Sequence, residues 1–409
     1  MPKCLNWGKQ IQMGRFSENF PVELWEEIMS WLPPDSLRRF KCVCKSWHAL
    51  ITFLIKNPEF VAKHLANMKK KKVCSPLIHL RNVITTNYTE RQEGTYFLTL
   101  ANDDLEDDYA DDLDDNLYIP CVTDNLKFLT CNLHNIFVKL VAHCNGIICL
   151  SAFDKNDIFI LLNPAIKEFK IVPNASPGDG SGERLVGFGY DLITNEYKIV
   201  NIKSLYEDED GPYKAEIFTL STNSWKEIDF NVNILYFPNC DYQVVYCNGV
   251  CYWYFWDGSC IIVSFDVSDE VFQIIPFPEN VPEPEKEWDI LAEWTKIAVW
   301  KNNLILFFYS ELYPMVIDMW VMDTSFGGVR GAYSWSKHLT IGPLENISYP
   351  LAFWDADELF METKDGEIIF YNLRSQELND HTVSLEPFHR NRLVTYAKSL
   401  VSVLKREET

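Results

Sequence analysis

The 409-residue sequence has no long hydrophobic run and no recognisable export signal. Its longest strongly apolar run, LILFFY at 304–309, is far too short to span a bilayer, so we expect no contact with a membrane. The first residues, MPKCLNWGKQIQMGRF, lack the apolar stretch of a secretory signal. The twelve cysteines show no regular framework, and we therefore expect reduced thiols and a location in the cytosol or the nucleus.

Positive charge is also scarce. The chain carries 37 Lys and Arg against 58 Asp and Glu, a formal net charge of −21. A chain this acidic repels phosphate backbones, which argues against nucleic acid as a partner. It attracts basic protein surfaces instead.

Motifs for catalysis, cofactors or metals are missing as well. The glycine-rich stretch PGDGSGERLVGFGYD precedes an expected strand and lacks the spacing of a phosphate loop. Cys247 and Cys251 straddle a hairpin turn with no histidine pair nearby. His143 and Cys144 are neighbours on a strand, so their side chains point to opposite faces. We expect no cofactor, no metal site and no catalytic residue.

What the sequence does contain is enough apolar surface for a packed core, since 47% of its residues are hydrophobic and 14% are aromatic.

Residues 15–66 form the first expected domain, a helical one. Leu24, Ile28 and Leu32 recur at helical spacing after Pro21, and Pro33-Pro34 ends that helix. A second helix is expected from Asp35, a third from about Ser46 to Asn57-Pro58, and one or two further turns after that.

The stretch FKCVCKSWHAL, residues 40–50, raises the question of a metal or redox site. We place Cys42 and Cys44 on one helix, where residues two apart do not face each other, so they should not join His48 in binding a metal. We interpret both as packing residues.

This helical domain is small and apolar on more than one face. Trp25, Trp31, Val43 and Trp47 cannot all point inward. The excess predicts a partner surface, unless it packs on the rest of the chain. The basic residues that follow, within 67–75, are expected to be a linker rather than a nuclear-import signal.

From residue 76 the pattern changes to short β-branched and aromatic runs. One hairpin type has a tight polar turn centred on Asn145, Asn248, Asn302 or Asp355, with a related turn at Asn195. A second type pairs an apolar residue with a bulky one seven positions later: Leu162 and Phe169, Phe218 and Trp225, Phe265 and Phe272, Tyr371 and Leu378, with a longer version around Trp320 and Trp335.

The two hairpins alternate with a period near 50 residues, which is the arithmetic of a four-stranded propeller blade. Five periods are visible between 134 and 385, and RLVTYAKSLVSVL at the C-terminus can complete a sixth sheet with PLIHLRNVI and GTYFLTL. The expected fold is therefore α+β and multidomain: a small helical domain, then an all-β propeller of six blades over 76–404. Two packed sheets are the alternative.

The helical domain resembles an F-box, the adaptor-binding motif of cullin-type ubiquitin ligases. The likeness lies in Pro21, ELWEEIMSWLPPDSL, RFKCVCKSW and NPEFVAKH, with Phe20 where the family usually has leucine. The resemblance implies that a Skp-type adaptor docks on a surface formed or supported by Phe20, Pro21, Leu24, Ile28, Leu32, Pro33, Leu37, Val43 and Trp47. Through the adaptor it implies cullin and a RING protein as further partners.

The remainder is similar to the F-box-associated repeat region of large plant F-box families, on ILLNPAIKEFKIVP, GFGYDLITNEYKIV, LSTNSWKEI and NGVCYW. The SLYEDEDGP insertion and the YIPC strand after an acidic loop are similar to S-locus F-box proteins of ribonuclease-based self-incompatibility. This implies a non-catalytic substrate receptor of a ubiquitin ligase, with a basic pistil S-ribonuclease as its target. Alternatives are a receptor for an unrelated target, or a propeller enzyme or carbohydrate-binding protein.

Acidic segments supply the candidate target-binding residues. The segment at 102–115 holds nine carboxylates but lacks the glycine and terminal glutamate of a calcium loop. It is either a solvated loop or an electrostatic lure for a basic target, and similar charge recurs at 207–210 and 279–289. The candidates are Asp103, Asp104, Asp107, Asp108, Asp111, Asp112, Glu207, Asp208, Glu209 and Asp210. We hypothesise that these segments gather on one propeller face.

Overall fold

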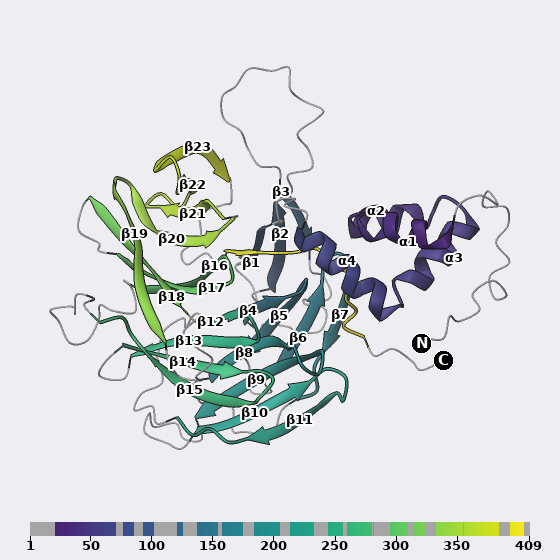
Figure 1. Cartoon of the computed structure of the whole chain (residues 1–409), viewed down its shortest axis with the longest axis horizontal. Coiled ribbons are helices and arrows are strands. Elements are labelled where there is room, and N and C mark those ends of the chain that lie inside the picture. The colour runs from purple at the N-terminus through teal and green to yellow at the C-terminus, as the bar shows by residue number, and fades with distance from the viewer. Residues whose placement is uncertain are drawn as a thin grey trace.

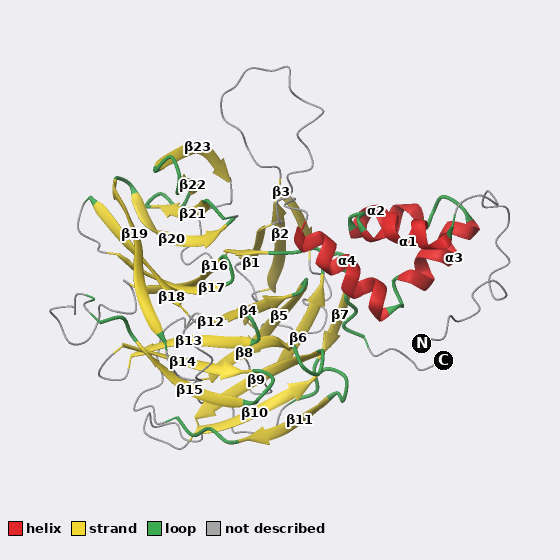
Figure 2. Cartoon of the chain, in the orientation of Figure 1, coloured by secondary structure: helices red, strands yellow, loops and turns green. Residues whose placement is uncertain are grey.

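The structure is a computed structural model of the whole chain. It describes residues 21–70, 77–85, 93–101, 121–125, 137–153, 158–174, 184–204, 213–232, 244–256, 260–279, 281, 295–309, 314–323, 333–354, 356–383 and 393–404. Helices occupy the N-terminal part of these residues and strands the rest, as Figure 2 shows. No helix among the described residues is long and apolar enough to cross a membrane.

The helical domain contains four helices in its described part: α1 (Val22–Ser30), α2 (Pro34–Phe40), α3 (Lys45–Leu54) and α4 (Pro58–Lys70). Pro21 precedes α1 and Pro33 precedes α2, and Pro34 is the first residue of α2, where the missing backbone donor is tolerated. The start of α1 after Pro21 and its end before Pro33-Pro34 are confirmed. The last helix is longer than the expected one or two turns, since it runs for 13 residues.

The expected position of the two cysteines is wrong. Cys42 and Cys44 lie in the turn between α2 and α3, not on a helix, and both are exposed and free. Cys44 has an extended backbone and is the residue before α3. That helix begins at Lys45, one residue before the expected start near Ser46. The cysteines are surface residues of a turn rather than packing residues.

The strands form six four-stranded antiparallel sheets (Figure 1). Five sheets consist of consecutive strands, and in each of them the chain runs from the inner to the outer edge: β4 (Phe137–Cys144), β5 (Ile147–Phe153), β6 (Ile158–Asn163) and β7 (Glu168–Ile171); β8 (Arg184–Asp191), β9 (Glu196–Ser204), β10 (Tyr213–Thr219) and β11 (Ser224–Ile228); β12 (Val244–Cys247), β13 (Val250–Trp256), β14 (Cys260–Asp266) and β15 (Val271–Pro276); β16 (Thr295–Trp300), β17 (Asn303–Tyr309), β18 (Met315–Asp323) and β19 (Ser334–Leu344); β20 (Ile347–Phe353), β21 (Glu358–Thr363), β22 (Ile368–Asn372) and β23 (Glu377–Val383).

The remaining sheet joins the two ends of the propeller. It has the order β24 (Leu393–Thr395), β1 (Leu77–Thr85), β2 (Glu93–Ala101) and β3 (Cys121–Asn125). Neighbouring sheets touch through their inner strands, from β4 through β8, β12, β16 and β20 to β24, and β1 then contacts β4. The all-β propeller is confirmed, and the alternative of two packed sheets is wrong. Closing the ring removes sheet edges that would otherwise be exposed to pairing with other chains.

The inner hairpins turn through residues of positive φ, as their sequences predict. Asn145 and Gly146 have φ of 51° and 80°, and Asn248 and Gly249 have 50° and 88°. Asn195 and Asn302 also have positive φ. Asp355 lies outside the described residues. Asparagine and glycine accept this conformation most readily, which is why they are found at tight hairpin turns.

In the outer hairpins the seven-residue spacing marks directly opposed cross-strand pairs. Leu162 lies opposite Phe169, Phe218 opposite Trp225, Phe265 opposite Phe272, and Tyr371 opposite Leu378. The longer hairpin of the fourth sheet departs from this pattern. There Trp320 lies opposite Lys337 and Trp335 opposite Met322, so the two tryptophans are diagonal neighbours rather than directly opposed.

The propeller core lies between adjacent sheets. Trp253, Phe188, Phe218 and Phe265 are fully buried in the largest cluster of apolar side chains. Tryptophans also tie neighbouring sheets together through their indole N–H groups. That of Trp225 donates to the carbonyl oxygen of Pro173 at 2.7 Å.

Candidate functional site

Helix α1 presents an apolar stripe to solvent. The stripe consists of Leu24, Ile28 and Trp31, at spacings of four and three residues. Such spacings place side chains on one face of a helix, and Trp31, the residue directly after α1, continues that face. Their exposed fractions are 47%, 44% and 39%. Pro21, immediately before the helix, is also exposed. Large apolar side chains lined up in water on a small domain mark a surface for a partner.

The opposite face of α1 is fixed to the rest of the domain. Met29 is buried in the core that α1 shares with α3 and α4. The hydroxyl of Ser30 accepts from the Asn67 amide at 2.8 Å, and His64 Nε2 donates to the carbonyl oxygen of Leu32 at 2.8 Å. These polar contacts join the end of α1 to α4, so the stripe is held on a stable scaffold.

Not every residue expected at the docking surface is exposed. Leu37 is buried at 1% and belongs to the domain core, so it is not part of the exposed surface. Trp47 is partly buried between Trp25 and Phe40, with ring centroids 5.7 and 5.0 Å away. Leu32 and Pro33 are also partly buried.

Val43 has the highest exposed fraction, 64%, among the exposed large apolar side chains in the described part of the helical domain, and it lies in the turn between α2 and α3. Together with Pro21, Leu24 and Ile28 it makes up the exposed part of the expected docking set. Phe20 lies outside the described residues. Trp31, which continues the stripe, is missing from that set, although its spacing from Leu24 gives a signal that could have included it.

The helical domain contacts the propeller through the C-terminal segment 396–404. Leu400 is buried in the core of the helical domain, alongside the partly buried Ile166 and Val401. Lys398 forms an ion pair with Asp35 at 3.0 Å. Lys69 at the end of α4 donates to Asn145 Oδ1 at 2.7 Å, so the domain meets a propeller turn directly.

The same segment is bound on its propeller side by one buried amide. The Asn163 amide donates to the carbonyl oxygens of Ser399 at 3.2 Å and Val401 at 2.7 Å. Its own carbonyl oxygen accepts from the Tyr396 hydroxyl at 3.1 Å. Residues 396–401 thus connect the two domains through both apolar packing and hydrogen bonds.

The turns of the inner hairpins share one face of the propeller, which we call the turn face and define by Asn145, Asn195, Asn248 and Asn302. The Tyr246 hydroxyl, at the end of β12, donates to the carbonyl oxygen of Tyr190 at the end of β8, at 2.7 Å. The Asn248 amide donates to the Asn302 carbonyl oxygen at 2.8 Å. Because Lys69 contacts Asn145, the helical domain also lies on the turn face.

All the acidic target-binding candidates, Asp103 to Asp112 and Glu207 to Asp210, lie outside the described residues, but the strand ends next to them are placed. Ala101 and Cys121 are paired at the end of their sheet where β1 begins after α4, which is the turn face. Ser204 and Tyr213, by contrast, are paired at the end opposite to Asn195. The strand ends that flank the two acidic segments therefore lie at opposite faces of the propeller, and the hypothesis that the segments gather on one face stays a prediction.

The pair His143 and Cys144 lies on β4, and the start of the glycine-rich stretch, 177–183, lies outside the described residues. Burial raises the pKa of the Cys144 thiol to about 12, which makes it a poor nucleophile. Cys247 and Cys251 flank an inner-hairpin turn as expected. No group of three or more His, Cys, Asp or Glu with metal-binding geometry occurs in the described part of the chain.

An exposed apolar stripe on a small helical domain, joined to a closed propeller, defines a two-domain protein of helical domain and β-propeller. The chain matches the F-box domain over residues 17–58 and the F-box associated beta propeller domain over residues 114–384. It belongs to the family of F-box proteins with an F-box-associated β-propeller.

The chain is also similar to curated F-box proteins of Arabidopsis thaliana. An F-box/kelch-repeat protein is 26% identical over 87% of this chain and 88% of its own length. The F-box protein CPR1 is 25% identical, over 88% of this chain and 83% of its own length. Among solved structures, the chain is similar to an AofleA mutant from Arthrobotrys oligospora, at 7% identity with a TM-score of 0.41 over 79% of this chain and 90% of that one.

Proposed function

We propose that the protein is the substrate receptor of a Skp–cullin–F-box ubiquitin ligase. The observation that carries the proposal is the exposed stripe of Leu24, Ile28 and Trp31, within a region that matches the F-box family. The stripe docks on a Skp-type adaptor, and the adaptor links the chain to cullin and a RING protein. The propeller binds a protein target and raises its effective concentration near the conjugating enzyme. In this role the chain needs no catalytic residue of its own.

Adaptor binding tests this proposal directly. Replacing both Leu24→Asp and Ile28→Asp places two carboxylates on the stripe, and burying them in an apolar interface is costly. We expect the affinity for a purified Skp-type adaptor, measured by titration calorimetry, to fall by at least about a hundredfold, as for loss of an interface hot spot. Val316→Asp, at a propeller residue of similar exposure, 39%, is the matched control. An adaptor that fails to bind the unmodified chain would contradict the proposal.

We further propose that the target is a basic protein, which fits the net charge of −21. The resemblance to S-locus F-box proteins makes a pistil S-ribonuclease the specific case to test. Replacing Asp103, Asp104, Asp107 and Asp108 with lysine should slow its association, because steering depends on long-range charge. Association rates at low and high salt check this. Adaptor binding without ribonuclease binding would keep the receptor function and point to an unrelated target outside self-incompatibility.

A further inference from the structure

The turn between β8 and β9 carries two apolar side chains into solvent. Leu192 is 58% exposed and Ile193 is 74% exposed, the highest value among the exposed large apolar side chains of the described residues. The pair lies on the turn face, beside Asn195. We call Leu192 and Ile193 the apolar knob.

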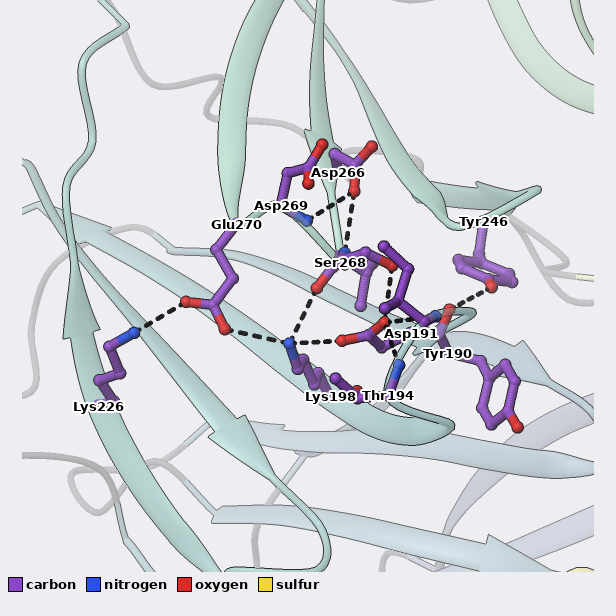
Figure 3. A network of polar contacts seen from close by, with 12 residues as sticks. Tyr190, Asp191, Thr194, Lys198, Lys226, Tyr246, Asp266, Ser268, Asp269 and Glu270 are labelled. Atoms are coloured by element: carbon purple, nitrogen blue, oxygen red, sulfur yellow. Dashed lines mark hydrogen bonds and ion pairs between the residues drawn. The ribbon is translucent and has the colours of Figure 1, made fainter.

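The buried carboxylate of Asp191 holds the knob in shape, and Figure 3 shows its contacts with Thr194, Lys198 and Ser268. Asp191 Oδ1 accepts hydrogen bonds from the backbone N–H groups of Ile193 at 2.9 Å and Thr194 at 3.0 Å. The Ser268 hydroxyl, from the neighbouring sheet, donates to the same oxygen at 2.7 Å. The other oxygen faces the ammonium of Lys198 at 2.9 Å. Both Asp191 and Lys198 are buried, so these contacts are shielded from water.

The network continues beyond Asp191 and clamps the turn from two sides. Lys198 also donates to the carbonyl oxygen of Val267 and to Glu270, each at 3.0 Å. On the other side, Leu192 packs against the backbone of Gly249, where an added Cβ would lie 3.3 Å from a Leu192 methyl carbon. The turn is therefore fixed before any partner arrives, which lowers the entropic cost of binding.

The surroundings of the knob are acidic. The formal net charge around it is −3, from five carboxylates and two lysines. These lie within residues 191–198 and 266–270, together with Lys226. Both lysines already face carboxylates of the same network, Asp191 and Glu270. A rigid apolar projection in an acidic rim is complementary to an apolar pocket rimmed by lysine and arginine. An anionic membrane surface would be repelled.

We propose that the apolar knob is an anchor for the ubiquitination target, inserted into an apolar pocket with a basic rim on that protein. The inference rests on the proposed receptor function and adds to it the residues and the surface chemistry of target recognition. Since the knob and the helical domain lie on the same propeller face, a target bound at the knob would be held on the side of the adaptor.

The test uses the full chain in complex with a purified Skp-type adaptor. The probes are short fluorescent peptides with a central apolar pair flanked by lysine and arginine, and a matched set flanked by glutamate. The variant is Leu192→Ser with Ile193→Ser, and the control is Ile274→Ser, at a propeller strand residue that is 45% exposed. We expect basic peptides to bind the unmodified complex, with affinity at least about tenfold lower in the double variant and unchanged in the control.

Asp191→Asn serves as a second variant, which leaves the knob residues in place but weakens their positioning. We expect it to reduce peptide affinity, and Leu192→Ser with Ile193→Ser to leave adaptor affinity intact. Failure of the basic peptides to bind, equal binding of the acidic peptides, or an unchanged affinity in the double variant would overturn the anchor. So would a loss of adaptor affinity in that variant, which would assign the knob to the adaptor. None of these outcomes affects the test of α1, which decides the receptor function separately.

Discussion

Buried polar residues connect neighbouring propeller sheets. Asp191 and Lys198 form an ion pair in one sheet, and they bind Ser268 and Val267 of the next. Burial raises the pKa of Asp191, but the hydrogen bonds from Thr194, Lys198 and Ser268 outweigh burial and hold the pKa well below its usual range. The carboxylate is therefore charged at neutral pH and depends on its partners for stability.

Removing the buried lysine should destabilise the protein strongly. Lys198→Met leaves Asp191 charged and buried without its cation, which costs about 3–5 kcal/mol in similar cases. Lys226→Met removes a second lysine that faces the same Glu270 at 3.0 Å, but Lys226 is 71% exposed. It should therefore cost less than about 1 kcal/mol. Urea denaturation measures both, and equal losses would contradict the role given to burial.

Desolvation of His143 should make stability fall in weak acid. Desolvation in the propeller disfavours the charged imidazolium and lowers the pKa of His143 to about 4, from an ordinary value of 6.5. Since the folded pKa is the lower one, the unfolded chain binds more protons between these values. The contribution of His143 is complete above pH 6.5 and is lost as the pH falls towards 4, at up to about 1.4 kcal/mol per pH unit.

His143→Gln should reduce this pH dependence. The difference in unfolding free energy between pH 7 and pH 5 should be smaller in His143→Gln than in the unmodified chain. Denaturation in urea at the two pH values measures it, and His48→Gln, at an exposed helix position, is the control. His64, whose pKa burial also lowers, contributes in the same direction and remains in both variants.

At the scale of elements, two Asn-Gly turns of the same conformation have different surroundings. A Cβ at Gly146 would lie 2.3 Å from the Ser399 hydroxyl oxygen and 2.6 Å from the Ala397 carbonyl oxygen. At Gly249 the nearest atom would be 3.3 Å away, on a flexible Leu192 side chain. Gly249→Ala should therefore cost only the strain of positive φ, about 1–2 kcal/mol.

Gly146→Ala should cost clearly more than Gly249→Ala, because the C-terminal segment must also move. Thermal unfolding of the two variants, compared with the unmodified chain, measures the difference. The paired design cancels the backbone strain that both substitutions share. Similar losses in both would show that the segment 396–401 is not packed against this turn.

These elements were largely predictable, because their signals are local. Positive-φ turns follow from Asn-Gly pairs, and cross-strand partners follow from a constant spacing of seven. The prediction failed where the local pattern was ambiguous. A run such as FKCVCKSW fits a helix by its apolar spacing, yet the chain turns between Phe40 and Lys45. The register of β18 and β19 was also not predictable, since bulges leave little trace in sequence.

The site was predictable to the extent that it lies on one helix. The stripe of Leu24 and Ile28 follows from helical periodicity together with the F-box resemblance. The burial of Leu37 does not follow from that motif, because the motif records which residues recur and not which face solvent. The knob at Leu192 and Ile193 gave no signal in the sequence. Its shape depends on Ser268 and Lys198, and only the folded propeller brings Ser268 to this turn.

At the scale of the whole molecule, the C-terminal segment makes one assembly of two domains. Leu400 lies in the core of a helical domain more than three hundred residues earlier in the chain, so no local pattern could have shown the contact. Leu400→Ala should destabilise the helical domain by about 2–5 kcal/mol, as for other buried leucines. Hydrogen exchange in α2 and α3 measures this, with Leu404→Ala, at an exposed position, as the control. Unchanged protection in both variants would contradict the coupling.

The proposed receptor function depends most on one contact, between α1 and a Skp-type adaptor. The most direct measurement is titration of purified adaptor into the full chain and into the variant with Leu24→Asp and Ile28→Asp. We expect tight binding to the unmodified chain and none detectable to the variant, with circular dichroism showing that both proteins are folded. Equal binding by the two proteins, or no binding by either, would contradict the proposed function.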